Sequence, residues 1–220
     1  SLALSKDQKI LRSKNVLTEK ILESSMIKSI DQLMRSCDLS LSKIDIIAVG
    51  LGPGSFTSLR VGLSTVKAFA LALNKKIIGI GSLDLIASSV LGGDADEICV
   101  IVDARREKIY AALYDRDLKL KTEYLLTSVD DLLTKVHGKT LFVGDGLGLY
   151  KTQIEKAYQN FAKNKKANCH ALFADEKFWF PQAKELAKLA FDRFDPTKEI
   201  KPEAIVPIYL YPQDCQVDRK

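Results

Sequence analysis

The sequence predicts an α/β fold built from two lobes, because both halves of the 220-residue chain repeat one pattern. In the first half, an apolar run at 44–49 enters a turn with glycine at every second position, and a helix follows at 55–73. In the second half, an apolar run at 140–143 enters another glycine-rich turn, and a helix follows at 149–162. Repetition of strand, glycine turn and helix indicates duplicated α/β lobes.

The first lobe is expected to span residues 1–93. Alternating residues and a polar turn predict a β-hairpin over 1–12, and a helix is expected over 16–36. Strand 76–80 and helix 82–91 complete this lobe. The stripe of apolar residues along the first helix consists of Leu22, Met26, Ile30 and Leu33.

The helix at 55–73 has more apolar surface than packing on one sheet requires. One face has large apolar side chains, and another has the smaller residues Val61, Thr65, Ala68 and Ala72. Gly62 lies between the two faces, where a glycine costs about 1 kcal/mol relative to alanine and so indicates close approach by a neighbouring element. Excess apolar surface on both helices predicts a partner interface; the alternative is burial of both faces inside one lobe. The expected contact residues are Leu22, Met26, Ile30, Leu33, Phe56, Leu59, Gly62, Leu63 and Val66.

The second lobe is expected to span 94–220, after a hinge at Gly92 and Gly93. Residues 163–178 are expected to be irregular, and 195–220 to be extended. The strands and helices of this lobe are expected at 98–102, 108–114, 140–143, 149–162 and 182–193.

The glycine turns and two aspartates that follow strands are candidates for nucleotide binding. A helix that begins after glycines can hold a phosphate on its free amides. The alternative is structural: the glycines allow strand and helix to pack closely, the aspartates accept backbone amides, and Ser55 caps the helix. The first turn matches neither the dinucleotide-binding nor the P-loop pattern. The candidate residues are Gly52, Gly54, Ser55, Asp103, Gly144 and Asp145.

The composition argues against several other kinds of site. The four cysteines lie far apart and the chain has two histidines, so neither a metal site nor a Ser/His/Asp triad is expected. We therefore predict no catalytic residue and no cofactor. The net charge of +5 is dispersed and does not argue for nucleic-acid binding. No apolar run approaches the roughly 18 to 20 residues that span a bilayer, and no signal peptide is recognised, so a cytoplasmic protein without membrane contact is expected.

Four stretches carry a resemblance to a known family. Gly52-Pro53-Gly54-Ser55-Phe56-Thr57, followed by residues 59–65, closely resembles the TsaB family, also called YeaZ, which acts in making the threonylcarbamoyladenosine of tRNA. Three later stretches match the family in the same order: 81–83, 103–106 followed by 109–111, and 207–210. The family commonly has glycine where Glu107 stands.

The resemblance implies an actin-like ATPase fold (ASKHA, ribonuclease H-like) of two duplicated lobes. In the family the chain opens with an apolar strand that carries an Asp-Thr-Ser turn, and residues 1–4 resemble the strand that comes next. The first strand of the first lobe is therefore expected to be absent from this chain.

The resemblance further implies a non-catalytic subunit of the tRNA N6-threonylcarbamoyladenosine modification complex. Such a subunit would pair through its two helices with the catalytic subunit TsaD, or with itself when TsaD is absent. It would act with the ATPase TsaE and meet tRNA only through the complex. One alternative is a small ATPase or kinase that uses Asp103 and the glycine turns. Another is a glycoprotease-like peptidase, against which the scarcity of histidine counts.

Overall fold

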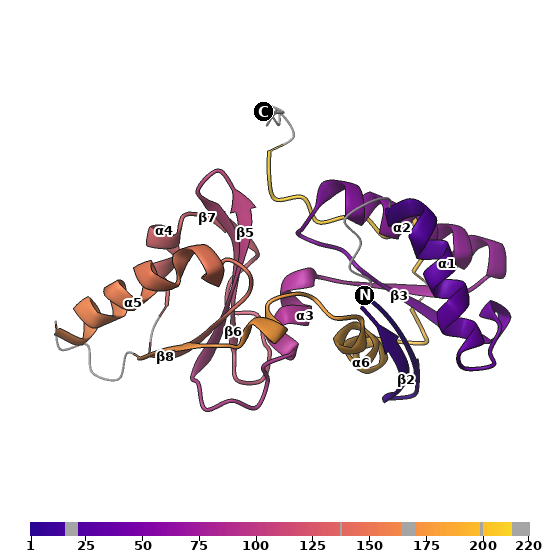
Figure 1. Cartoon of the computed structure of the whole chain (residues 1–220), viewed down its shortest axis with the longest axis horizontal. Coiled ribbons are helices and arrows are strands. Elements are labelled where there is room, and N and C mark those ends of the chain that lie inside the picture. The colour runs from indigo at the N-terminus through magenta and orange to yellow at the C-terminus, as the bar shows by residue number, and fades with distance from the viewer. Residues whose placement is uncertain (16–21, 137, 164–169, 199, 213–220) are drawn as a thin grey trace. The chain divides into compact units, whose positions relative to one another are not determined.

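The computed structural model describes residues 1–15, 22–136, 138–163, 170–198 and 200–212, and the chain divides into two compact units (Figure 1). Unit 1 comprises Ser1–Leu85 and Pro181–Ile208, and unit 2 comprises Ile86–Phe180 and Tyr209–Lys220. This division differs from the expected boundaries of 1–93 and 94–220. The physical reason is that helix α6 (Ala183–Arg193) packs on the strands of unit 1.

Unit 1 contains two separate two-stranded sheets. Strands β1 (Leu2–Lys6) and β2 (Lys9–Lys14) form the predicted antiparallel hairpin, and β3 (Ile46–Gly50) pairs in parallel with β4 (Lys76–Ile80). Each of these four strands therefore has one edge that pairs with no other described strand.

The β3–β4 sheet is covered on both faces. Side chains alternate along a strand, and Ile47 and Val49 pack with helix α2 (Phe56–Leu73) while Ile46 and Ala48 pack with α6. Burial on both faces explains why this strand reads as a continuous apolar run. Helix α6 also contacts β1 and β2, so it lies across both sheets of unit 1 (Figure 1).

The other helices of unit 1 follow the sequence pattern with small differences. Helix α1 (Leu22–Arg35) packs on β1, and its predicted residues 16–21 lie outside the described part of the chain. Helix α2 ends at Leu73, and the left-handed conformation of Asn74 lets the Lys75 amide donate to the carbonyl of Ala70 at 2.9 Å. Helix α3 (Ser82–Ser88) ends before the predicted residue 91.

Unit 2 is built on one five-stranded mixed sheet in the order β7-β6-β5-β8-β9. Antiparallel pairing joins β5 to β6 and β6 to β7, while β8 lies parallel to both β5 and β9. The prediction that residues 163–178 are irregular was wrong for 170–173, which form strand β9. The strands are β5 (Glu97–Arg105), β6 (Lys108–Asp115), β7 (Leu125–Thr127), β8 (Lys139–Val143) and β9 (His170–Phe173).

Two helices bury one face of this sheet. Helix α5 (Leu147–Lys163) contributes Ile154 and Tyr158 to the main core, and the short helix α4 (Val129–Leu133) adds Leu132. Ser128 caps α4 by accepting the amide of Asp131 at 3.1 Å.

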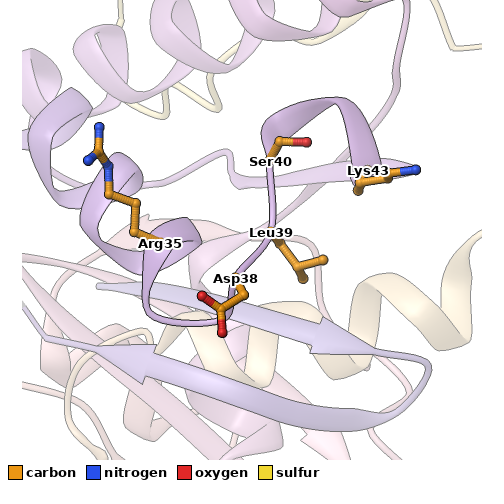
Figure 2. Close-up of a pocket in the computed structure, with 5 residues that line it drawn as sticks. All are labelled: Arg35, Asp38, Leu39, Ser40 and Lys43. Carbon is orange, nitrogen blue, oxygen red and sulfur yellow. The ribbon is translucent and has the colours of Figure 1, made fainter.

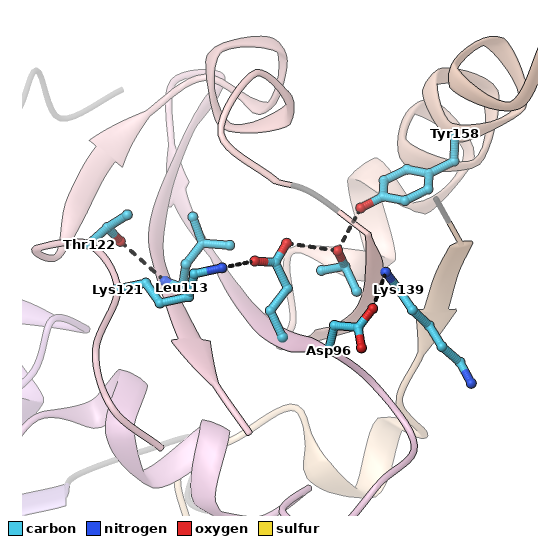
Figure 3. Close-up of polar contacts among 8 residues, drawn as sticks. Asp96, Leu113, Lys121, Thr122, Lys139 and Tyr158 are labelled. Atoms are coloured by element: carbon cyan, nitrogen blue, oxygen red, sulfur yellow. Dashed lines mark hydrogen bonds and ion pairs between the residues drawn. The ribbon is translucent and has the colours of Figure 1, made fainter. Parts of the chain in front are cut away.

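A buried polar chain connects the sheet of unit 2 to α5 (Figure 3). Glu97 is 1% exposed, and one of its carboxylate oxygens forms an ion pair with Lys121. Its other oxygen accepts the Thr140 hydroxyl at 3.0 Å, and Tyr158 donates to Thr140 at 2.8 Å. Because each member has a partner, the burial of this carboxylate does not leave an unpaired charge.

The turn between β5 and β6 has a strained backbone. Arg105, Arg106 and Glu107 have φ values of 66°, 52° and 58°, in the left-handed region that favours glycine. The Asp103 carboxylate accepts the Arg105 amide at 2.8 Å, and Tyr211 donates its hydroxyl to the carbonyl of Ala104 at 2.9 Å. These contacts hold the turn in a conformation that its own residues disfavour.

We predict that Glu107→Gly stabilises the protein by about 0.5 to 1 kcal/mol, because glycine adopts this φ without steric cost. Urea unfolding followed by circular dichroism measures the change. Lys108→Gly is the matched control, since Lys108 begins β6 and glycine should destabilise a strand there. Equal destabilisation by both substitutions would show that the turn is not strained at Glu107.

Candidate functional site

The outer face of α2 is apolar or small along its whole length. Helical spacing places Thr57, Val61, Ser64, Thr65, Ala68, Leu71 and Ala72 on the side opposite the buried residues Leu63 and Ala70. We call these seven residues the outer face. None of them is charged, although an exposed helix face normally is polar. The two charged residues of α2, Arg60 and Lys67, lie on one flank of the helix.

Three large apolar side chains of α1 and α2 are more than half exposed. Leu71 is 60% exposed, Phe56 at the start of α2 is 52% exposed, and Ile27 on α1 is 58% exposed. The Arg60 guanidinium lies 3.9 Å from the centre of the Phe56 ring. Such side chains raise the free energy of an isolated surface and favour contact with another apolar surface.

The structure divides the residues expected at the interface into three groups. Leu33 and Leu63 are buried in the cores of unit 1 and are not available on its surface. Met26, Ile30, Leu59, Gly62 and Val66 are partly buried, and Phe56 is exposed. The side chain of Leu22 lies outside the described part of the chain. The sequence prediction therefore selected mainly the side of α2 that packs on the sheet. The exposed side of α2 is formed by the smaller residues.

Gly62 faces open space. Among the described residues, a Cβ atom at this position would meet no atom within 4 Å apart from the adjacent helix backbone. The close approach that a mid-helix glycine indicates is therefore not made by the described part of unit 1.

The glycine turn before α2 is packed against its surroundings. Gly52 has a φ of 93°, and a Cβ there would lie 2.7 Å from Leu59 Cδ1 and 3.3 Å from the carbonyl oxygen of Ile208. The Ser82 amide donates to the carbonyl of Gly52 at 2.7 Å. At Gly54, in contrast, a Cβ would meet no atom of the described residues within 4 Å. These contacts favour a packing role for Gly52.

The start of α2 differs from the expected cap. Ser55 is the N-cap residue, but its side chain accepts no backbone amide and instead accepts the hydroxyl of Ser58 at 3.1 Å. The prediction that the Ser55 side chain caps the helix is therefore wrong.

Asp103 and Asp145 lie together in unit 2. The Asp103 amide donates to Asp145 Oδ1 at 3.0 Å, and Arg105 Nη1 lies 3.1 Å from Asp103 Oδ2. Burial raises the pKa of the Asp145 carboxyl, and the Asp103 amide opposes this shift. Gly144 has a φ of 119°, and a Cβ there would clash with the carbonyl oxygen of Ile101. Each carboxylate thus accepts a backbone amide, which is what the structural alternative predicted.

A shallow pocket of about 530 Å³ lies after α1. It is lined by Arg35, Asp38, Leu39, Ser40 and Lys43 (Figure 2). Figure 2 shows the charged ends of Arg35, Asp38 and Lys43 pointing away from one another rather than toward a common ligand position. Within the described residues, no group of three or more His, Cys, Asp and Glu side chains could hold a metal ion.

By length and composition alone, α2 would also be able to cross a membrane. The helix is not an uninterrupted apolar run, because it contains Arg60 and Lys67. Core helices of soluble proteins pass the same test, and one such helix is weak evidence. The inner side of α2 packs on β3 and β4 through Leu63 and Ala70, which favours a helix that lies on a sheet.

Sequence reasoning missed the part that residues 202–208 play beside α2. This segment was expected to be merely extended, yet Ile205 is buried with Leu63 and Ala70. The available signal was the short apolar run that contains Ile205, Val206 and Ile208.

Comparison with known proteins places these features in a family. A family model described as TsaD, tRNA N6-adenosine threonylcarbamoyltransferase, matches residues 17–204. The chain is 25% identical to the tRNA threonylcarbamoyladenosine biosynthesis protein TsaB of Escherichia coli, over 84% of this chain and 78% of that protein. It is 29% identical to the TsaB protein of Bacillus subtilis over 58% of each chain.

Other relatives are matched over shorter stretches. An uncharacterized protein of Mycobacterium tuberculosis is 38% identical over 34% of each chain. An uncharacterized protein of Mycobacterium leprae is 38% identical over 37% of this chain. The chain therefore spans 34% and 21% of the lengths of these two relatives.

The solved structure of YeaZ from Pseudomonas aeruginosa has the same fold, with a TM-score of 0.69 at 21% identity over 94% of this chain and 92% of that chain. This confirms the mixed α/β fold. The chain belongs to the TsaD family, tRNA N6-adenosine threonylcarbamoyltransferase, and the relatives named TsaB and YeaZ confirm the resemblance carried by the glycine turn.

Proposed function

We propose that this chain is a TsaB-type, non-catalytic subunit that pairs with a TsaD protein in making the threonylcarbamoyladenosine of tRNA. The single observation that carries the proposal is the uncharged outer face of α2, with Leu71 60% exposed. The TsaB names of relatives matched over much of the chain support the pathway. The proposal includes a cytoplasmic location, association with a TsaE-type ATPase, and contact with tRNA through the complex.

The small residues of the outer face are better suited to close packing against another helix than to contact with water. Ser64, Ala68 and Ala72 allow a partner backbone to approach closely, and the open space at Gly62 extends this surface. A standard protein interface buries about 800 Å² on each partner. Within the outer face, Leu71 supplies the larger apolar contact. In the absence of TsaD, the same surface would pair with a second copy of the chain.

The carboxylates of unit 2 support a non-catalytic role. Asp103 and Asp145 each accept a backbone amide, and Asp103 also faces Arg105. These bonds shape the hairpin between β5 and β6. A nucleotide phosphate with its metal ion would compete for the same oxygens.

We further propose that the two units are duplicated lobes and that unit 1 accepts one more strand. The antiparallel pair β1–β2 corresponds to β6–β7, and the parallel pair β3–β4 corresponds to β8–β9. The counterpart of β5 would then be a strand between β1 and β3, each of which has one edge that pairs with no described strand. Helix α6 contacts all four strands of unit 1 and would cover the inserted strand.

We predict that pairing fails when the outer face is altered. Ala68→Arg places a charge in the middle of this face, and Gly62→Leu fills the open space at its edge. Each variant should bind TsaD at least about tenfold more weakly, equivalent to about 1.4 kcal/mol, while its unfolding midpoint stays near wild type. Isothermal titration with purified TsaD measures the affinity, and analytical ultracentrifugation measures self-association.

Thr152→Arg and Thr152→Leu are the matched controls, because Thr152 is exposed on α5 in unit 2. These variants should bind TsaD as the wild type does. Wild-type affinity in Ala68→Arg would remove α2 from the interface. Binding of the wild type to lipid vesicles in place of TsaD would favour a membrane surface instead.

The added strand is tested by extending the chain before Ser1. A designed apolar strand joined through an Asn-Gly turn should pair with β1 and β3 and slow amide hydrogen exchange at alternate residues of β3. The control is the same extension with proline in the strand, which cannot complete the ladder. Unchanged exchange in β3 with the apolar extension would contradict the proposal.

The non-catalytic assignment predicts that the chain alone hydrolyses no ATP and that Asp103→Ala does not change the threonylcarbamoylation rate of the assembled complex beyond about twofold. Phosphate release and radiolabel transfer to tRNA measure the two activities. An ATPase activity of the isolated chain that Asp103→Ala abolishes would replace this assignment with an actin-like ATPase.

A further inference from the structure

A segment remote in sequence packs against the inner side of α2. We call residues 202–208 the strap. Ile205 is 7% exposed and belongs to the core cluster that contains Leu63 and Ala70 of α2 together with Val49 and Ile77 of the strands. The strap therefore completes the core on which α2 rests.

The strap also contacts the turn from which α2 begins. The Ile208 amide donates to the carbonyl of Leu51 at 2.8 Å. The carbonyl oxygen of Ile208 would lie 3.3 Å from a Cβ at Gly52, and Leu59 of α2 packs against the same glycine. A change in the path of the strap would therefore change the contacts that position the first turns of α2.

A third contact lies farther along the helix. The short helix η3 (Pro202–Ala204) contacts α2, and Lys67 Nζ donates to the carbonyl of Glu203 at 3.5 Å. This long hydrogen bond is exposed and weak. Ile205 is the one buried residue of the strap, so it is the main anchor.

We infer that the strap sets the position of α2 on the β3–β4 sheet, and that Ile205 is a positioning residue for the outer face. Ile205 acts through Leu63 and Ala70, because it lies on the buried side of the helix. The part of the inference that concerns partner binding rests on the proposed function. Cores are close-packed, so removal of the Ile205 side chain leaves a space into which α2 can shift.

The experiment compares Ile205→Ala with Val206→Ala. Val206 is the adjacent residue of the strap and is 59% exposed, so its truncation is the matched control. Amide hydrogen exchange of α2 should become at least about tenfold faster in Ile205→Ala and remain unchanged in Val206→Ala. Affinity for TsaD, measured where circular dichroism shows the variant folded, should fall about tenfold in Ile205→Ala and recover in Ile205→Val.

Two readouts separate failure of this inference from failure of the proposed function. Faster exchange in α2 with unchanged TsaD affinity supports the strap and contradicts the partner surface. Unchanged exchange in α2 overturns the inference whatever the affinity. If Ile205→Ala does not fold, Ile208→Pro removes the amide that donates to Leu51 and keeps Ile205. Faster exchange at the start of α2 is then the expected result, and wild-type exchange overturns the inference.

Discussion

The burial of β3 and β4 on both faces is the constraint on which unit 1 depends. Alternate residues of β3 pack with α2 and with α6, so both helices are needed to cover the two faces of the strand. Helix α6 lies far along the chain from these strands, which is why unit 1 is assembled from two segments. The same burial commits the Leu63 side of α2 to the core and leaves the outer face as the side that meets solvent or a partner.

The two units differ in how fully their polar groups are paired. In unit 2, the charge of Glu97 is balanced by Lys121 and its second oxygen is satisfied through Thr140, so the sheet and α5 are linked inside one unit. In unit 1, β1 and β3 keep edges that pair with no described strand. Unpaired strand edges are sites for strand addition, and this is the physical basis for expecting a further strand there.

Much of the fold could be predicted because apolar periodicity is strong in its longer elements. The hairpin β1–β2, strand β4 and helix α2 follow from local pattern alone. Strand β9 and helix α4 were missed because each has few residues and little periodicity. The division into units also escaped prediction, since the packing of α6 on distant strands is a tertiary property.

The candidate site was less predictable than the fold, for a reason visible in α2. Large apolar residues such as Leu63 were read as partner contacts, yet large apolar side chains are also those that a sheet buries first. The small residues opposite them carry less apolar signal but form the surface that remains open.

The two glycine turns share one local sequence pattern but make different contacts. In unit 2, Gly144 is required by the carbonyl of Ile101, and the adjacent Asp145 supports the backbone at Asp103. In unit 1, Gly52 instead makes room for Leu59 and Ile208, which ties the start of α2 to the strap. Protein atoms therefore lie close against one glycine of each turn, Gly52 in unit 1 and Gly144 in unit 2. What distinguishes the two turns is the element each one positions, a hairpin in unit 2 and the proposed partner helix in unit 1.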